Sequence, residues 1–170
     1  TKIVEPVFKM NGGAIYYINI SQDDFKLGGS SFAQIVNKIG NEAPSVKSAD
    51  YVKTVFNTLQ GLIKNEKILA GHDVASGGLI TTLLELCFAN VNTGADLDLT
   101  ALKEEDCIKM LFAENAGVVI QAADDSVDAV FTANGIDAVK IGTVTDADQL
   151  NIKNHTMKNT LSVSEMRDTW

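Results

Sequence analysis

The sequence predicts an α+β fold in which a mixed β-sheet carries packed helices. Strand-like and helix-like segments alternate along the 170 residues. Several connections are nevertheless too short for the right-handed crossovers that join parallel strands. Apolar residues make up 45% of the chain and charged residues 21%, which is the composition of a folded globular protein. We therefore expect one domain, residues 1–170, whose sheet mixes parallel and antiparallel pairs.

The predicted strands are recognised by their β-branched and aromatic content. The first runs from Ala14 to Ile20, IYYINI being its apolar centre. In a later strand, Asp96 and Asp98 alternate with apolar residues, which is typical of a strand with one solvated face. The sequence after residue 145 is less regular and predicts a hairpin and a tail. The further strands are expected at residues 68–74, 95–99, 117–121 and 138–144.

The predicted helices follow from apolar residues at helical spacing. In the first helix this spacing begins at Phe32 and reaches Ile39, and Gly40 predicts its end. Ser31 and Gln34 match a capping box at its start. The further helices are expected at residues 48–63, 80–88, 104–112 and 124–134, the last ending at Gly135.

The charge and composition exclude several classes of protein. The net charge is −8, with 22 acidic and 14 basic residues, which argues against a nucleic-acid partner. It does not argue against a nucleotide, because carboxylates can hold phosphate through Mg²⁺. No apolar run is long enough to cross a membrane, and the N-terminus lacks the apolar core of a secretory signal. The chain begins with Thr1 rather than Met, so we expect it to be cut from a longer protein.

The two cysteines are too few and too irregularly spaced for a zinc site or a disulfide framework. Cys87 lies in an apolar helical stripe, so we expect a buried thiol rather than a nucleophile. This cysteine usage predicts a reducing compartment, and we expect the cytoplasm.

Two glycine doublets, each directly before a predicted helix, are the candidate phosphate-binding segments. Gly28, Gly29 and Ser30 precede the first helix, and Gly77 and Gly78 precede the third. A helix N-terminus favours anions, and glycine lets the backbone approach a phosphate closely. Tight turns with serine caps explain the same residues equally well. The chain has no P-loop, dinucleotide-binding or nucleophile-elbow motif.

Asp73 is the candidate metal ligand. It lies near the C-terminal end of its predicted strand, where ligands gather in layered folds, and could coordinate Mg²⁺ on a nucleotide. Capping of the following turn is the alternative. We expect His72 to face the opposite way, in a core or interface. Glu85 is interpreted as part of a solvated helix face and Glu114 as a loop carboxylate.

Three segments resemble motifs of the phosphoribosylformylglycinamidine synthase family. Residues 27–34, LGGSSFAQ, resemble its L-G-G-S-x-x-A-Q motif. Residues 71–89, GHDVASGGLITTLLELCFA, are similar to its H-D-x-S-x-G-G-L segment and the helix that follows. Residues 111–121, LFAENAGVVIQ, resemble its L-F-x-E-x-x-G-x-V-I-Q stretch. The three motifs occur in the family's order and cover most of the chain.

The resemblance implies a fold, an activity and a ligand. The family converts formylglycinamide ribotide, glutamine and ATP into the amidine during purine biosynthesis. Its synthase part contains two pairs of N- and C-terminal domains followed by a glutaminase, and this chain resembles the C-terminal domain of the second pair. The resemblance further implies an auxiliary site that holds ATP or ADP with Mg²⁺, the metal being bound by Asp73 and by the missing partner domain. Ala75 replaces the usual serine, which removes one hydroxyl from this site.

The implied partners are the AIR-synthase-like N-terminal domains and the glutaminase of the same polypeptide. Because these parts are missing, we expect the isolated chain to be inactive. The residues alone leave two alternative functions open. One is a stand-alone interaction module whose glycine loops are simple turns. The other is the equivalent domain of AIR synthetase or selenophosphate synthetase.

Overall fold

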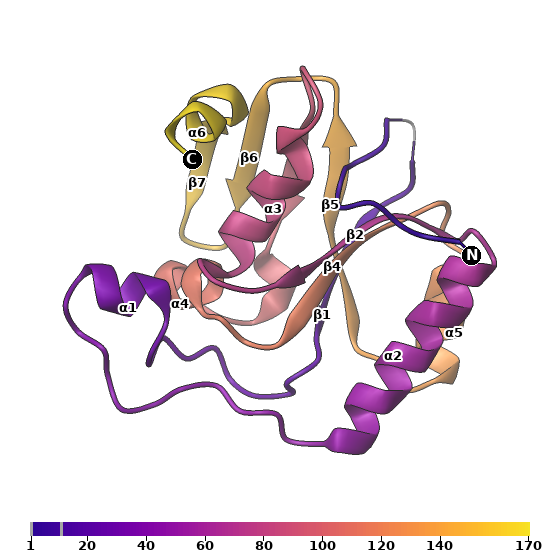
Figure 1. Cartoon of the computed structure of the whole chain (residues 1–170), viewed down its shortest axis with the longest axis horizontal. Coiled ribbons are helices and arrows are strands. Elements are labelled where there is room, and N and C mark those ends of the chain that lie inside the picture. Colours follow the sequence, from indigo (N-terminus) through magenta and orange to yellow (C-terminus); the bar gives the residue numbers. More distant parts are fainter. Residues whose placement is uncertain (1, 11) are drawn as a thin grey trace.

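The computed structural model describes residues 2–10 and 12–170, and this part of the chain forms a seven-stranded sheet (Figure 1). The strands are β1 (Ile15–Asn19), β2 (Ile68–Val74), β3 (Gly94–Asp98), β4 (Gly117–Ala122), β5 (Ala138–Thr145), β6 (Gln149–Lys153) and β7 (Lys158–Ser162). Their order is β2-β4-β1-β5-β3-β6-β7. β3 and β6 are parallel, and the other neighbours are antiparallel. The sheet and its packed helices confirm the predicted fold class.

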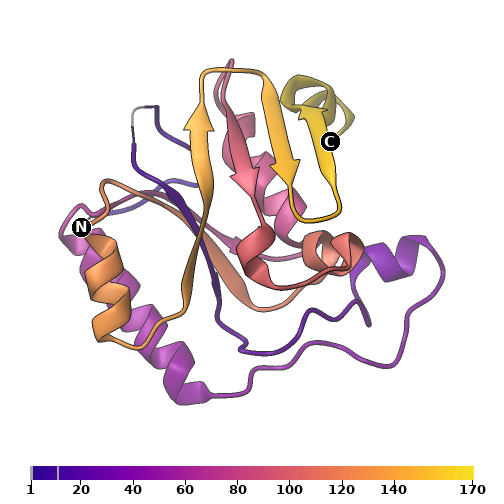
Figure 2. The ribbon, with the colours of Figure 1, turned by 180° about the vertical axis from the view of Figure 1, so that it is seen from behind.

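Helices cover both faces of this sheet. They are α1 (Ser31–Ile35), α2 (Ala49–Lys64), α3 (Gly78–Phe88), the 3-10 helix η1 (Thr100–Leu102), α4 (Cys107–Phe112), α5 (Val127–Ala133) and α6 (Val163–Thr169). α3, α4 and α6 pack on one face, and α2 and α5 pack together on the other, as Figures 1 and 2 show from opposite sides. Within the described residues, no helix combines the length and apolarity needed to cross a bilayer.

β1 is an interior strand of the sheet, between β4 and β5, and is buried on both faces. Ile15 and Tyr17 belong to the core beneath α3, whereas Tyr16 and Ile18 belong to the core beneath α2 and α5. Successive side chains of a strand point to opposite faces, so one apolar run supplies both cores. Cys87 of α3 is fully buried, as predicted, and burial raises the pKa of its thiol to about 12.

The first helix is shorter than its apolar spacing predicts. α1 ends at Ile35 because Asn37 adopts a left-handed φ of 56° and closes the helix. The N–H of Asn37 donates to the carbonyl of Gln34, and that of Lys38 donates to the carbonyl of Ala33. This pair of bonds is a Schellman motif, whose left-handed residue is usually glycine and sometimes asparagine. The predicted end at Gly40 is therefore wrong.

Three further details differ from the sequence predictions. The N-cap of α1 is Ser30, whose hydroxyl accepts from the N–H of Ala33 at 3.2 Å, so the capping box at Ser31 is wrong by one residue. α4 and α5 begin at Cys107 and Val127, each three residues later than predicted. The tail after the β6–β7 hairpin forms the unpredicted helix α6.

Residues 24–47 form a long excursion from the sheet, in which α1 is the helix (Figure 1). We call this segment the α1 excursion. Its base is held by Asp23, whose side chain is 4% exposed and forms ion pairs with Lys26 and Lys47. Asp23 also accepts from the backbone N–H of Ser45 at 2.9 Å. The tip leaves Ile35, 84% exposed, in contact with solvent.

Candidate functional site

The turn between β2 and α3 contains one of the two glycine doublets. Gly77 is the N-cap of α3 with a φ of 88°, and as a glycine it has no side chain of its own to cap the helix. Gly78, with a φ of 75°, lies against the end of α4, so that a Cβ there would be 2.7 Å from the carbonyl oxygen of Leu111. Glycine is required at both positions by the left-handed backbone, and at Gly78 also by this close approach.

Asp73 is the second-last residue of β2, close to this turn, and its side chain is 81% exposed. The imidazole of His72 lies between two carboxylates, 3.4 Å from Oδ1 of Asp73 and 3.3 Å from Oε2 of Glu85. The side chain of Glu85 is only 29% exposed and contacts His72. The prediction that Glu85 belongs to a solvated helix face therefore holds only in part. Asp73 also borders an open groove of about 580 Å³, whose other walls include Gln60 of α2 and Lys2.

The second glycine doublet lies at the start of the α1 excursion. The N–H of Gly28 donates to the carbonyl of Glu42 at 2.9 Å, and the N–H of Gly29 donates to that of Ile39 at 2.9 Å. A Cβ at Gly28 would be 2.3 Å from the same Glu42 oxygen. Ser30 caps α1 and also donates its hydroxyl to the carbonyl of Leu27 at 2.7 Å. This doublet is therefore folded onto the returning half of its own loop.

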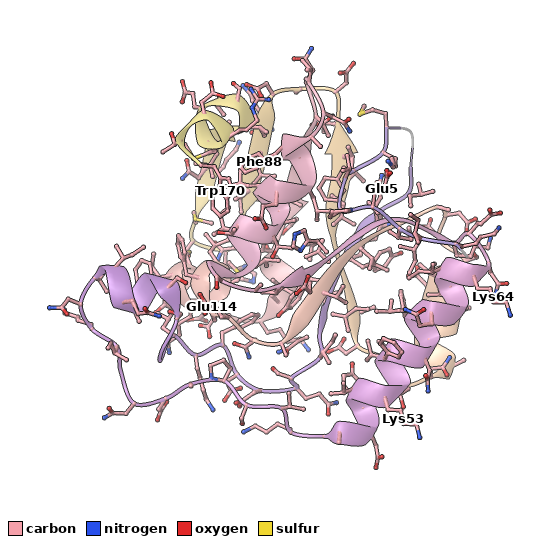
Figure 3. All side chains as sticks on the ribbon, viewed as in Figure 1. Glu5, Lys53, Lys64, Phe88, Glu114 and Trp170 are labelled. Carbon is pink, nitrogen blue, oxygen red and sulfur yellow. The ribbon has the colours of Figure 1, made fainter. Side chains whose placement is uncertain are left out.

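Glu114 joins the two glycine segments. Its Oε1 atom accepts from the N–H of Ser31 at 2.8 Å and from the N–H of Gly77 at 2.8 Å. Figure 3 shows Glu114 near α1 and α4, below the start of α3. Sequence reasoning assigned Glu114 only to a loop, because its two donors lie 83 and 37 positions away along the chain. The position of Glu114 in the third motif was the available signal.

The N–H groups of all five predicted phosphate-binding residues have partners within the chain. Gly28 and Gly29 donate to the returning loop, Ser30 donates to Leu27, Gly78 donates to Ala75, and Gly77 donates to Glu114. Gly77 has no side chain that could cap α3, and the carboxylate of Glu114 lies instead at the partial positive charge of the helix start. The arrangement is suited to an anion at this junction, and a carboxylate of the protein itself lies there.

The described residues do not form a complete metal site. Nowhere in this part of the chain do three or more His, Cys, Asp or Glu side chains form a group that could hold a metal ion. Mg²⁺ binds six oxygens and keeps several waters, so an exposed aspartate such as Asp73 can supply one of its ligands. Further protein ligands would have to come from outside these residues.

Comparison with known proteins identifies the family. Residues 12–154 match the family described as AIR synthase related protein, C-terminal domain. The chain belongs to this family. It is 36% identical over its whole length to the probable phosphoribosylformylglycinamidine synthase, chloroplastic/mitochondrial, of Arabidopsis thaliana, and 34% identical over 84% of its length to the probable enzyme of Caenorhabditis elegans. It spans about 12% of the length of either relative.

Solved structures share the fold of this AIR synthase related domain. Thermotoga maritima PurL complexed with FGAR has a TM-score of 0.72 over 97% of the chain, at 14% identity, and the chain covers 29% of PurL. PurL complexed with ATP gives 0.71 over 98% of the chain, at 13% identity and 27% coverage of PurL. The hydrogenase maturation protein HypE gives 0.62 over 94% of the chain, at 16% identity and 55% coverage of HypE. At these identities the likeness is one of fold.

In this AIR synthase related domain, the three sequence motifs meet at one junction. Residues 27–34 form the first glycine loop and α1, residues 71–89 form β2, the second glycine loop and α3, and residues 111–121 run from α4 into β4. Glu114 of the third motif bonds to the backbone of the other two. The motifs are thus connected in space although the sequence separates them.

Proposed function

We propose that this chain is one domain of a phosphoribosylformylglycinamidine synthase, the ligase that uses ATP and glutamine to convert formylglycinamide ribotide into its amidine. The observation that carries the proposal is the 36% identity to the Arabidopsis enzyme over the whole chain. The PurL and HypE folds alone would not distinguish the synthase from a sister enzyme, because both resemble this domain. Identity to two proteins named as synthases favours the first.

We propose that the domain contributes an auxiliary nucleotide site at an interface with the rest of the enzyme. ATP or ADP would lie with its phosphates near Gly28, Gly29, Ser30, Gly77 and Gly78. Asp73 would supply one ligand to the accompanying Mg²⁺, and a neighbouring domain would supply the others. The exposed carboxylate of Asp73 and the spatial junction of the two glycine loops support this assignment. A phosphate would engage Gly28, Gly29, Ser30 and Gly78 by replacing their internal backbone partners, while the bond from Gly77 to Glu114 is kept.

The proposed partners are the AIR-synthase-like N-terminal domains and the glutaminase of the same polypeptide. The relatives are roughly eight times longer than this chain, which supports such neighbours. A net charge of −8 does not favour a nucleic-acid partner.

We further propose that residues 1–170 form one domain, since a continuous sheet includes strands from residue 15 to residue 162. A cytoplasmic location stays a proposal, and the Arabidopsis relative is named as chloroplastic/mitochondrial.

The substitution Asp73→Asn in the longer enzyme tests whether the site is auxiliary. Asparagine keeps the shape and one acceptor oxygen but loses the charge that opposes the metal. At an auxiliary site, the purified variant should carry less bound nucleotide and melt a few degrees earlier, while kcat stays close to that of the wild type. Unchanged melting and nucleotide content with a collapse of kcat would assign Asp73 to the working site instead.

The matched control is Asp146→Asn in the turn between β5 and β6. Asp146 is exposed, and its side chain makes no hydrogen bond or ion pair among residues 2–10 and 12–170. The control removes the same charge from a position away from the glycine loops. It should leave the nucleotide content, melting temperature and kcat unchanged.

A further inference from the structure

Two backbone N–H groups from distant parts of the chain converge on one oxygen of Glu114. One belongs to Ser31, the first residue of α1, and the other to Gly77, the N-cap of α3. Both bonds are 2.8 Å long, as expected for an N–H that donates to an ionised carboxylate. Such bonds are roughly twice as strong as those to neutral acceptors. A single side chain therefore links the two glycine loops.

The same junction also has an apolar contact. Phe32 of α1 lies against Phe112 of α4, with ring centroids 4.9 Å apart. Ala33, the next residue of α1, is 3% exposed. Glu114 lies two residues after Phe112, so the aromatic contact and the carboxylate come from one short segment at the end of α4. Together they attach the first turn of α1 to the end of α4 and to the start of α3.

The other contacts of the α1 excursion lie nearer its base. The ion pairs of Asp23 with Lys26 and Lys47 hold its two ends together, and Lys47 donates its N–H to the carbonyl of Ser21. These bonds close the loop but do not connect its glycine doublet to the doublet of α3. The Glu114 carboxylate makes that connection through Ser31 and Gly77.

We propose that Glu114 is a positioning residue, which holds the two glycine loops at a fixed spacing so that they can receive one phosphate-bearing ligand together. This inference rests on the proposed nucleotide site. Glu114 acts through the backbone and does not itself bind the ligand. Its bond to Gly77 fixes the start of α3 and its bond to Ser31 fixes the first turn of α1, so that the loops are ordered before the ligand arrives. Such prior ordering lowers the entropy that binding would otherwise lose.

We call the two bonds from Ser31 and Gly77 to Glu114 the clamp. A proline at position 31 removes one bond of the clamp without removing the Glu114 carboxylate, so it distinguishes the two effects. Ser31 is the first helical residue of α1, where proline is well tolerated and where its missing N–H disrupts no bond within the helix. Ser30 has φ −64° and ψ 158°, the extended conformation that a residue before proline prefers. Ser31→Pro therefore removes the bond to Glu114 and keeps Glu114, Gly77 and α1. Glu114→Ala removes both bonds, and Glu114→Gln keeps the acceptor without the charge.

Amide hydrogen exchange on the 170-residue chain tests the clamp itself. In Glu114→Ala, the amides of Ser31 and Gly77 should exchange at least about tenfold faster, while amides of β1 stay unchanged. In Glu114→Gln the increase should be smaller, and in Ser31→Pro the amide of Gly77 should stay protected. Glu105→Gln is the matched control, since Glu105 is exposed and its side chain has no hydrogen bond or ion pair in the described chain. Equal exchange in wild type and Glu114→Ala would overturn the clamp.

Binding of Mg·ADP to the longer enzyme tests the positioning role. We expect Glu114→Ala and Ser31→Pro each to raise the Kd by on the order of tenfold, with a smaller rise for Glu114→Gln and none for Glu105→Gln. Tight binding by the wild type and an unchanged Kd in both clamp variants would overturn the positioning role and leave the proposed function intact. Absence of Mg·ADP binding by the wild type would refute the proposed site, while the exchange experiment would still decide whether the clamp exists.

Discussion

The two glycine doublets have the same place in the sequence pattern but different surroundings in the fold. Gly28 and Gly29 lead into α1, a helix of five residues on a loop that leaves the sheet. Gly77 and Gly78 lead into α3, a helix of 11 residues whose inner face belongs to the core. The first doublet packs on the backbone of its own loop, whereas Gly78 packs on the backbone of α4. Only the second doublet thus packs against a helix that belongs to the core of the domain.

This difference teaches that a glycine doublet before a helix predicts a turn but not its rigidity. Gly29 and Gly77 have similar left-handed φ values of 76° and 88°. A Cβ at Gly29 would meet no atom within 4 Å, whereas a Cβ at Gly77 would be 2.2 Å from Oγ1 of Thr81. The same backbone conformation is therefore exposed in one loop and enclosed in the other. Substitutions at these glycines should have unequal effects.

The largest effect is expected for Gly78→Ala. The new Cβ would lie 2.7 Å from the Leu111 carbonyl and 2.8 Å from Phe112 Cα, in a residue with positive φ. Backbone strain and overpacking together should lower the free energy of unfolding by about 3 kcal/mol. For a chain of this size, the melting temperature should fall by roughly 10 °C in a calorimetric scan.

Gly61→Ala in α2 is the control for this substitution. A Cβ at Gly61 would meet no atom within 4 Å, and the residue lies inside a helix. Alanine there should raise the free energy of unfolding by about 0.5–1 kcal/mol. If Gly78→Ala were as stable as Gly61→Ala, the backbone around Gly78 would accept a side chain as readily as that around Gly29. The two doublets would then not differ in how tightly they are packed.

A second effect, confined to the α1 excursion, is expected in acid. The bond from Lys26, followed by that from the Ser45 N–H, holds the pKa of Asp23 well below its usual range near 3.9. Because the pKa of the folded state is lowered, this stabilisation is complete above about pH 5 and is lost as the pH falls below about 4. Trypsin-like cleavage is slow in acid, so pepsin or hydrogen exchange should detect the loosening of residues 24–47 while α3 remains protected.

Asp23→Asn should loosen the α1 excursion already at pH 7, where trypsin cleavage after the exposed Lys38 reports it. Asp98→Asn is the matched control. The pKa of Asp98 is also lowered, to about 2, first by the Thr100 hydroxyl and then by Lys153, but Asp98 lies on β3. Cleavage after Lys38 should be unchanged in this control. Equal cleavage in both variants would show that Asp23 does not hold the base of the excursion.

A smaller effect is expected for Gly29→Ala. The side chain would enter open space, so the left-handed backbone is the remaining penalty, about 1 kcal/mol. Gly135→Ala provides the comparison, because Gly135 has a φ of 64° and a Cβ there would also meet no atom within 4 Å. The two variants should have similar unfolding midpoints in urea. A loss near 3 kcal/mol at Gly29 alone would remove the distinction between the doublets.

Much of the fold could be predicted from local sequence patterns. The apolar and β-branched run at residues 117–121 and the helical spacing of α2 each identify an element without tertiary information. Gly135 also ends its helix as predicted. Asn37 ends α1 in the same way, but asparagine is common in many conformations and Gly40 gave the stronger stop signal. The error in α1 therefore comes from turn chemistry rather than from the apolar pattern.

The candidate site was less predictable because its contacts are distant in sequence. The glycine doublets and Asp73 could be named from their positions before helices and at the end of a strand. Nothing local indicated that Glu114 would accept from Ser31 and Gly77, since those donors lie on two other elements. The ion pair of Asp23 with Lys47 likewise joins the two ends of the whole excursion. Such bonds are defined by the tertiary fold.

The smallest expected effect is the absence of measurable nucleotide binding by the 170-residue chain alone. The N–H groups of both glycine doublets already have partners within the chain, so a phosphate would have to break bonds in order to form them. Asp73, 81% exposed, offers one carboxylate to Mg²⁺, which would keep most of its waters. The entropy lost on association would then be poorly compensated at either doublet. Titration calorimetry should therefore detect no Mg·ADP affinity tighter than about 1 mM, and the chain should have no synthase activity. Micromolar affinity would show that the two doublets form a self-contained site, in which case no neighbouring domain would be needed to complete it.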